Sequence, residues 1–279
     1  METRSEEEEQ QSPKMRLVRL CSRQRGPATV YVQGFCAQSR VASDFRDWFD
    51  SHRRIAAAEP EWAGPAWGLS WPTGDAGGSF DNLGGWPVPA ASAAWFIMRR
   101  ASRLPVGGAV AAVAADVLLT AARAALHFRE TERTLKTAAP AMAELLYGLH
   151  KETGGYRVVA HSLGVRMAVE AISELPIDAR PTEAHLCGAA CTASQLAGRA
   201  EELSRGERVH YYNPRDLTLR SAYRLVARES AAGVAPLPGI ESINASTHLA
   251  ASYSHQYAAF FDTLALEALR RRRARDAPR

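Results

Sequence analysis

The segment 156–176 constrains the fold of this chain more than any other. It opens with a β-branched run over residues 156–160, directly after two glycines, as expected of a buried parallel strand. A His-Ser-Leu-Gly turn that carries Ser162 follows, and apolar residues then recur at helical spacing until Pro176. The sequence therefore predicts a strand, a sharp turn at Ser162 and a helix.

Ser162 is a candidate nucleophile because of this position. A serine on a sharp turn between a strand and a helix is exposed at the edge of a parallel sheet. Small residues, Ala160 and Gly164, stand two positions away on each side, where the strand and helix backbones approach closely. The usual pattern has glycine at both positions, so Ala160 departs from it. The alternative is a strand–helix turn with an incidental serine.

The rest of the chain alternates between strand-like and helix-like patterns. Further strands are expected at 16–20, 28–32, 66–71, 185–190 and 209–212. Helices are expected at 45–58, from Pro140 to the residues before Gly154, after Ser162, and from Tyr257 onward. This alternation predicts an α/β fold, a three-layer α/β/α sandwich with a mostly parallel sheet. In such sheets, active groups lie outside the carboxyl ends of the strands.

Asp216 is the candidate acid of a catalytic triad. A serine hydroxyl needs a base to take its proton and an acid to orient that base. For a strand–serine–helix site, the expected chain order is serine, acid, histidine. Asp216 closely follows the strand expected at 209–212, whereas Asp178 comes early, right after the helix that follows Ser162. A turn-forming aspartate after Asn-Pro is the alternative role for Asp216.

The base must be one of the two histidines that follow Asp216, namely His248 or His255. We choose His255 because it lies immediately before the last helix, where a loop returns its imidazole to the sheet edge. His248 is the alternative base. His161 adjoins Ser162, but we expect it to point away from the serine and to pack or form hydrogen bonds in the core.

Two backbone amides are candidates for holding the oxyanion that develops during acyl transfer. In this type of site one donor is the amide after the serine, here Leu163, and the other comes from the loop after an early strand. The Phe35 amide is the second candidate because it follows the strand expected at 28–32, and Gly34 allows close backbone approach. The alternative is a glycine that merely ends the strand.

Together these motifs resemble the α/β-hydrolase superfamily. Residues 30–35 look like its oxyanion strand, 70–74 resemble the Trp-Pro-Ser-type turn of some bacterial lipase-like relatives, 160–164 look like its nucleophile elbow, and 211–216 look like its acid loop. The resemblance covers residues 28–265 and is closest to lipase-like families of unknown function that carry an apolar insertion before the nucleophile strand. It implies hydrolysis of an ester, thioester or amide through an acyl-enzyme, without a cofactor.

The insertion shapes the predicted domain organisation. We expect a disordered acidic head at 1–14, an α/β-hydrolase-like domain at 15–270, a helical cap insertion at 84–131 within it, and a basic tail at 271–279. The alanine-rich run at 106–128 is long enough to span a bilayer. Its polar residues, however, fall on one helical stripe: Asp116, Thr120, Arg123 and His127. A cap is therefore the first interpretation, with an interfacial or a spanning helix as alternatives.

Charge, cysteine spacing and the N-terminal composition limit which partners, metal sites and locations are expected. The excess positive charge behind the net charge of +4 lies mostly at the chain ends. We interpret the basic tail as a solvated end, with contact to an anionic membrane or nucleic acid as the alternative, so no nucleic-acid partner is expected. The four cysteines show neither a Cys-x-x-Cys pair nor a Cys/His ligand spacing, so neither a zinc site nor a disulfide scaffold is expected. The acidic N-terminus lacks the apolar run of a secretory signal. This predicts a cytoplasmic location, with membrane association through the insertion as the alternative.

The predicted function is therefore a serine hydrolase that acts on a carboxylic ester, thioester or amide. Its expected substrate is a small-molecule ester or a lipid-like molecule. Ser162 attacks, His255 moves the proton, Asp216 orients the imidazole, and the Phe35 and Leu163 amides hold the oxyanion. Two alternatives are a non-catalytic binding protein that keeps the fold and a membrane-associated lipase.

Overall fold

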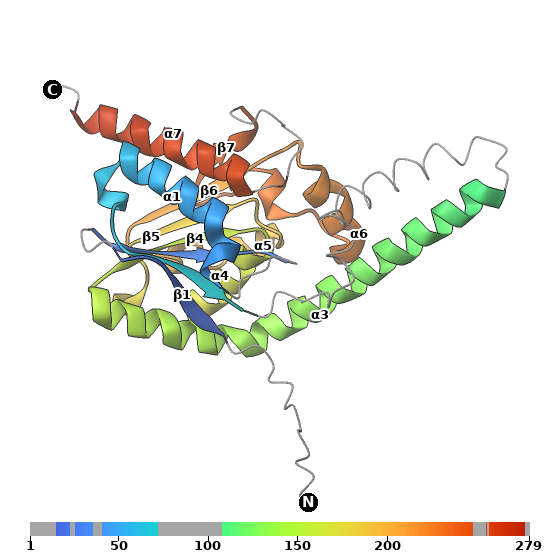
Figure 1. The fold of residues 1–279 in the computed structure, drawn as a ribbon, viewed down its shortest axis with the longest axis horizontal. Coiled ribbons are helices and arrows are strands. Elements are labelled where there is room, and N and C mark those ends of the chain that lie inside the picture. The colour runs from blue at the N-terminus through green and yellow to red at the C-terminus, as the bar shows by residue number, and fades with distance from the viewer. Residues whose placement is uncertain are drawn as a thin grey trace, which may run out of the picture.

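A seven-stranded sheet forms the centre of the molecule (Figure 1). The computed structural model describes residues 15–22, 26–35, 41–71, 108–247, 255 and 257–276. The strands are β1 (Arg16–Cys21), β2 (Ala28–Val32), β3 (Ala66–Ser70), β4 (Tyr156–His161), β5 (Glu183–Cys187), β6 (Glu207–Tyr212) and β7 (Glu241–Asn244). They lie in the order β1-β3-β2-β4-β5-β6-β7, and every pair is parallel except the edge pair of β1 and β3. The predicted α/β class with a mostly parallel sheet is confirmed.

Helices cover both faces of the sheet. The longer ones are α1 (Arg46–Ala58), α3 (Gly108–Thr153), α4 (Leu163–Ser173) and α7 (Tyr257–Asp276), and the shorter ones are α5 (Ala193–Ala197), the π-helical η6 (Thr218–Tyr223) and α6 (Arg224–Ala227). Single 3-10 turns are η1 (Ala42–Phe45), η2 (Pro60–Trp62), η4 (Ile177–Ala179), η5 (Ala200–Glu202), η7 (Ala232–Val234) and η8 (Ala245–Thr247). In Figure 1, α1 and α7 lie on one face of the sheet, and α3 and α4 on the other.

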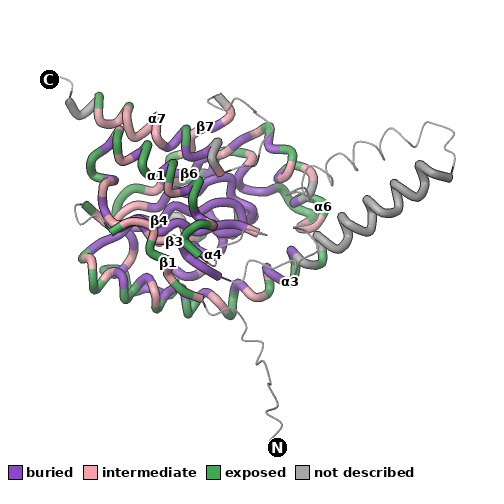
Figure 2. The backbone as a smooth tube through the Cα atoms, viewed as in Figure 1, coloured by how far each residue is buried: buried purple, intermediate pink, exposed green. Residues whose placement is uncertain are grey.

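Alternation along the central strands explains why two cores form. Successive side chains of a strand point to opposite faces. Val158 of β4 therefore packs with α3 and α4, while Val159 packs with α1 and α7. All six residues of β4 are buried, and buried backbone concentrates in the sheet in Figure 2. A strand that is covered on both faces reads as a continuous apolar run, which is why its sequence pattern was clear.

The helix α3 differs from the sequence prediction. A separate helix was expected to open at Pro140, but α3 is one helix of 46 residues with Pro140 inside it. A proline in a helix interior removes one backbone hydrogen bond and kinks the helix without always ending it. Figure 1 shows the N-terminal half of α3 projecting beyond the sheet. Residues 84–107 of the expected cap lie outside the described residues, and 108–131 belong to α3.

One predicted strand is shorter than expected, and one strand was missed. The strand expected at 185–190 is β5, which ends at Cys187 because Gly188 turns the chain with a φ of 53°. The strand β7 was not predicted. The basic tail was expected to start at residue 271, but α7 runs on to Asp276 and Arg271 forms ion pairs with Glu207 and Glu241.

No helix within the described ranges combines the length and the apolar character needed to cross a membrane.

The strand order places a switch point beside β4. From β2 the chain moves to β3 on one side, and then crosses over through α3 to β4 on the other side of β2. In open α/β sheets, ligands bind at such a point, outside the carboxyl ends of the strands. Gly34 follows β2 and Ser162 follows β4, so both lie at this point.

Candidate active site

Ser162 lies on a strained turn between β4 and α4. Its φ of 57° and ψ of −126° are unfavourable for any residue other than glycine. Backbone hydrogen bonds hold the turn in place. The Ser162 N–H donates to the Cys187 carbonyl at 3.0 Å, and the Ser162 carbonyl accepts from Ala190 and Val165 at 3.1 Å each. The predicted strand–turn–helix at Ser162 is thus present, and the sheet and α4 together maintain its strain.

Two glycines let the neighbouring backbones approach this turn. A Cβ atom on Gly34 would lie 2.6 Å from the Ser162 Cβ and 3.2 Å from its Oγ. A Cβ atom on Gly164 would lie 2.4 Å from the Gln33 carbonyl oxygen. The distances of 2.6 and 2.4 Å are too short for a real side chain, so the loop after β2 and the start of α4 require glycine at these positions. Ala160, the departure from the usual pattern, is fully buried in β4 and is accommodated there.

His255 joins Ser162 to Asp216. The distance from His255 Nε2 to Ser162 Oγ is 2.8 Å, and that from His255 Nδ1 to Asp216 Oδ2 is 2.6 Å. A carboxylate only accepts hydrogen bonds, so Nδ1 carries the ring proton and Nε2 accepts from the serine hydroxyl. The structure therefore brings together the three residues predicted as nucleophile, base and acid, from three separate parts of the chain.

The loop after β6 fixes the Asp216 carboxylate. Asn213 Oδ1 accepts from the Arg215 amide at 2.9 Å, and the Asp216 amide donates to the Asn213 carbonyl at 3.1 Å. The carboxylate is fully buried, and its Oδ1 accepts from the Leu219 amide at 3.0 Å while Oδ2 faces His255. The turn geometry considered for Asp216 thus coexists with its contact to His255. Asp178, the other acid considered, is exposed in η4.

The two predicted oxyanion donors occupy suitable backbone positions. Leu163 is the first residue of α4, and the first N–H groups of a helix have no partner within the helix. Phe35 follows Gly34, whose backbone lies against Ser162. The Trp71 indole donates to the Gln33 backbone carbonyl at 3.0 Å, and the Gln33 side-chain Nε2 donates to the Asp44 backbone carbonyl at 3.3 Å, which fixes this loop. That Phe35 and Leu163 bind an oxyanion stays a prediction.

Sequence reasoning missed two contacts of this site. Trp71 was noted only as part of a turn, yet its indole anchors the loop that carries Phe35; the remaining residues of that turn, 72–74, lie outside the described residues. His161 was expected in the core and is buried, but its ring also lies 4.8 Å from the His255 ring, centroid to centroid. Neither contact has a local sequence signal. His248, the alternative base, lies outside the described residues.

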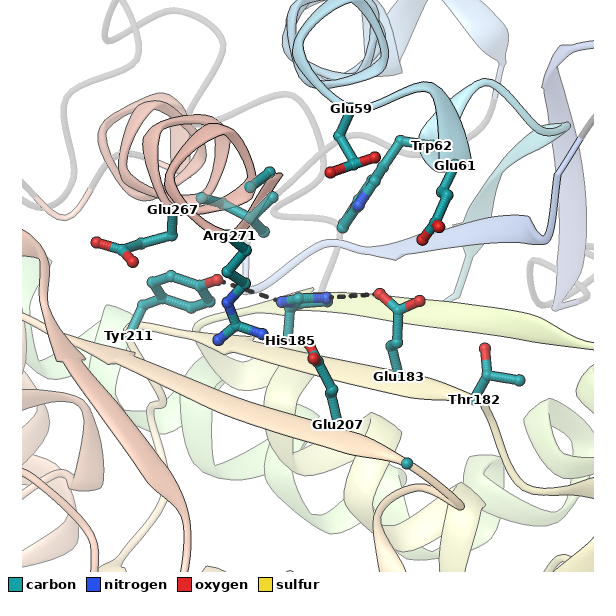
Figure 3. A pocket seen from close by; sticks show the side chains of 13 residues that line it. Glu59, Glu61, Trp62, Thr182, Glu183, His185, Glu207, Tyr211, Glu267 and Arg271 are labelled. Atoms are coloured by element: carbon teal, nitrogen blue, oxygen red, sulfur yellow. Dashed lines mark hydrogen bonds and ion pairs between the residues drawn. The ribbon is translucent and has the colours of Figure 1, made fainter. Parts of the chain in front are cut away.

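A cavity of about 260 Å³ opens at the opposite, amino edge of the strands (Figure 3). Its lining includes Glu183, His185, Tyr211 and Arg271. Hydrogen bonds and ion pairs join these side chains to one another or to neighbouring residues. Glu183 accepts from Arg157 at 2.9 Å, and the His185 ring lies 3.3 Å from both the Glu183 carboxylate and the Tyr211 hydroxyl. We interpret the residues that line this cavity as a structural hydrogen-bond network, separate from the Ser162 site.

Among the described residues, no group of three or more His, Cys, Asp or Glu side chains is placed to hold a metal ion.

Comparison of the chain with protein-family models, with curated proteins and with solved structures finds no match.

Proposed function

We propose that the protein is a serine hydrolase of the α/β-hydrolase type that cleaves a carboxylic ester, with thioesters and amides as chemically related substrates. One observation carries the proposal. The His255 ring lies within hydrogen-bond distance of the Ser162 hydroxyl at 2.8 Å and of the Asp216 carboxylate at 2.6 Å. These distances fall in the range that a nucleophile, base and orienting acid need.

The proposed reaction follows from this geometry. His255 Nε2 takes the Ser162 proton as Oγ attacks the substrate carbonyl carbon, and the carbonyl oxygen becomes an oxyanion. The Leu163 and Phe35 amides donate to that oxygen. His255 then gives its proton to the leaving alcohol, which departs and leaves an acyl-serine. Water repeats the sequence with the acyl-serine and releases the acid. Asp216 stays ionised and stabilises the imidazolium in both halves.

The strain at Ser162 favours catalysis over simple binding. A serine with positive φ costs roughly 1–3 kcal/mol and persists only where surrounding structure maintains it. Such strain clusters at active sites, and on a turn between a strand and a helix it places the hydroxyl at the sheet edge while the main chain stays paired. A protein that only bound a ligand would gain nothing from a serine held in this conformation against a histidine.

Aromatic side chains beside the oxyanion loop favour an apolar acyl group. The Phe35 and Phe128 rings pack edge to face with centroids 5.4 Å apart, and Phe128 packs against Tyr223 at 5.9 Å. Phe35 follows β2, Phe128 lies on α3 and Tyr223 on η6. We therefore include an aliphatic or aromatic acyl chain in the proposed substrate, because it would contact these rings without burying polar atoms.

A fluorophosphonate probe tests the proposal. We expect it to label the wild-type protein once, at Ser162, with a mass increase on the peptide that contains this residue. The Ser162→Ala variant should not be labelled. A panel of p-nitrophenyl esters of increasing acyl length then tests the apolar acyl group. Failure of the folded wild type to react with the probe would contradict the proposed function.

A further inference from the structure

His161 precedes the nucleophile and occupies an aromatic cluster on the face of the sheet opposite α4. Its ring packs against Trp48 of α1 at 6.4 Å and against Phe260 of α7 at 5.7 Å, centroid to centroid. The His255 ring is closer, at 4.8 Å with an angle of 39° between the ring planes. The side chain is 7% exposed. His161 therefore contacts the proposed base from inside the protein, while Ser162 contacts it at the sheet edge.

Burial keeps His161 neutral. Loss of water and the neighbouring His255 lower the pKa of His161 well below its usual range, and a hydrogen bond to the His255 backbone acts in the opposite direction. A hydrogen bond that raises the pKa of an imidazole is one in which the ring N–H donates, so the acceptor is the His255 carbonyl. Nε2 of His161 has no partner within the described ranges, which leaves Nδ1–H as the donor.

His255 needs such support because its two known partners touch only the tip of its side chain. Ser162 and Asp216 bind the ring nitrogens, but His255 itself lies outside helix and strand, just before α7 begins at Tyr257. Gly188 borders the ring on another side, where an added Cβ would lie 3.4 Å from His255 Cε1. Within the described part of the chain, the contact with His161 reaches the backbone of His255, and it comes from the buried end of β4.

We propose that His161 is a positioning residue: its ring, which packs against the His255 ring with centroids 4.8 Å apart, and its N–H, directed at the His255 backbone, hold the His255 imidazole between Ser162 and Asp216. This role rests on the proposed serine hydrolase function. It couples the base to the strand that carries the nucleophile, because His161 and Ser162 are neighbours in the chain. A neutral ring also adds no positive charge beside His255 when the base takes up its proton. A misplacement of the base by about 1 Å costs about 100-fold in rate.

Two substitutions separate the N–H donor from the bulk of the ring. His161→Phe keeps an aromatic ring in the cluster but removes the donor. His161→Asn keeps an N–H donor near the position of Nδ1 but removes the ring. Where the phenylalanine variant does not fold, His161→Leu removes the donor at smaller volume. Melting temperatures of all variants report the structural cost separately from the effect on His255.

The first readout does not depend on hydrolysis. A proton shared between His255 Nδ1 and Asp216 gives a downfield proton NMR signal, which is assigned by its absence in Asp216→Asn. We expect this signal in the wild type and in His161→Asn, and its broadening or loss in His161→Phe. A sharp signal of unchanged position in His161→Phe would overturn the proposal, as would the absence of the signal from the wild type at low temperature.

The second readout is turnover of a p-nitrophenyl ester. We expect kcat to fall about 10- to 100-fold in His161→Phe at unchanged KM, and to recover partly in His161→Asn. A lower melting temperature with full kcat would show a purely structural role and overturn the proposal. If the NMR signals behave as expected but the wild type reacts with neither ester nor fluorophosphonate, the hydrolase function fails while the positioning of His255 by His161 stands.

Discussion

Two trios, each made of a carboxylate, a histidine and a hydroxyl, lie at opposite edges of the sheet in this protein. At the carboxyl edge, Asp216, His255 and Ser162 follow one another at 2.6 and 2.8 Å. At the amino edge, Glu183 and the Tyr211 hydroxyl each lie 3.3 Å from the His185 ring (Figure 3). The residue types are nearly the same, so the difference between the two edges shows what a triad needs besides its composition.

In the trio at the amino edge, the pKa values of all three groups are shifted in directions that disfavour proton transfer. Burial raises the pKa of Glu183, but hydrogen bonds from His185 and Arg157, with the charge of Arg157, outweigh it and lower this pKa to about 2. Burial lowers the pKa of His185 and raises the pKa of the Tyr211 hydroxyl. The acid is thus shared with an arginine, the histidine resists protonation, and the hydroxyl resists deprotonation. We therefore interpret the amino-edge trio as a network that stabilises the fold and does not activate its hydroxyl.

Backbone geometry separates the two edges further. Ser162 lies on a strained turn where a helix starts, at the switch point of the sheet. Tyr211 lies within β6, is 1% exposed, and has no comparable turn beside it. A helix start also supplies the Leu163 amide next to the nucleophile. The comparison indicates that the turn and its helix start, more than the acid–histidine pair, distinguish the proposed site of acyl transfer from the amino edge.

The largest expected effect compares the two hydroxyls. Ser162→Ala should lower kcat for a p-nitrophenyl ester by about 10⁶-fold, because the acyl-enzyme can no longer form. Tyr211→Phe should leave kcat within about twofold, because this substitution removes only a structural hydroxyl. Steady-state kinetics on both variants test the comparison. Loss of activity in Tyr211→Phe with an unchanged melting temperature would place the chemistry at the wrong edge.

The next largest effect on kcat is expected when each of the two carboxylates is replaced by an amide. Asp216→Asn should lower kcat by about 10⁴-fold, because an amide that donates to His255 Nδ1 leaves the ring in the wrong tautomer. Glu183→Gln should leave kcat nearly unchanged in protein that remains folded at 25 °C. Kinetics at neutral pH separate the two variants. Equal losses of kcat in both would mean that His255 is not oriented by Asp216.

The sequence was informative where a local pattern of residues determines the structure of one strand or turn. The run at 156–160 and the glycine at 164 predict the Ser162 turn because burial on both faces and close backbone approach restrict these residues directly. Chain order then limited the acid and the base to residues after Ser162, and the positions after a strand and before the last helix favoured Asp216 and His255 over Asp178 and His248. The strand β7 escaped prediction because its residues, Glu-Ser-Ile-Asn, are mostly poor strand formers and it pairs only at the sheet edge.

Contacts between distant segments could not be predicted in this way. The Trp71 indole and the Gln33 carbonyl are brought together by the pairing of β2 with β3, and His161 meets His255 through the docking of α7. The unbroken helix α3 was missed for a different reason. A proline is a strong local signal for a helix start, but the packing of α3 against α4 overrides it.

The amino edge should instead control stability. Glu183→Gln leaves the Arg157 guanidinium, 1% exposed, without its carboxylate, and should lower the free energy of unfolding by roughly 3 kcal/mol at pH 7. In the wild type the pKa of Glu183 is about 2, below its ordinary value of 4.5, so its contribution is complete above pH 5 and is lost as the pH falls towards 2. His185, whose pKa is also lowered, acts in the same direction below about pH 6.5.

Urea unfolding at pH 7 and pH 3 tests this prediction. The difference in unfolding free energy between wild type and Glu183→Gln should shrink at pH 3, because the wild-type carboxylate has then begun to lose its advantage. Asp216→Asn serves as the matched variant at the other edge. A constant difference at both pH values would mean that the Glu183 charge does not contribute to stability.

The smallest expected effect compares two tryptophans of the β3 region. Trp71→Phe removes the N–H that donates to the Gln33 carbonyl and loosens the loop that carries the Phe35 amide, so kcat should fall about 10-fold with little change in KM. Trp67→Phe is the control, because the Trp67 indole N–H has no hydrogen-bond partner in the described part of the chain. Trp67 also packs against Arg19, so this variant reports the cost of a smaller ring without loss of a donor. Equal kcat values in the two variants would mean that the Trp71 hydrogen bond does not hold the oxyanion loop, and that the strained turn at Ser162 and its helix start suffice to fix the donors.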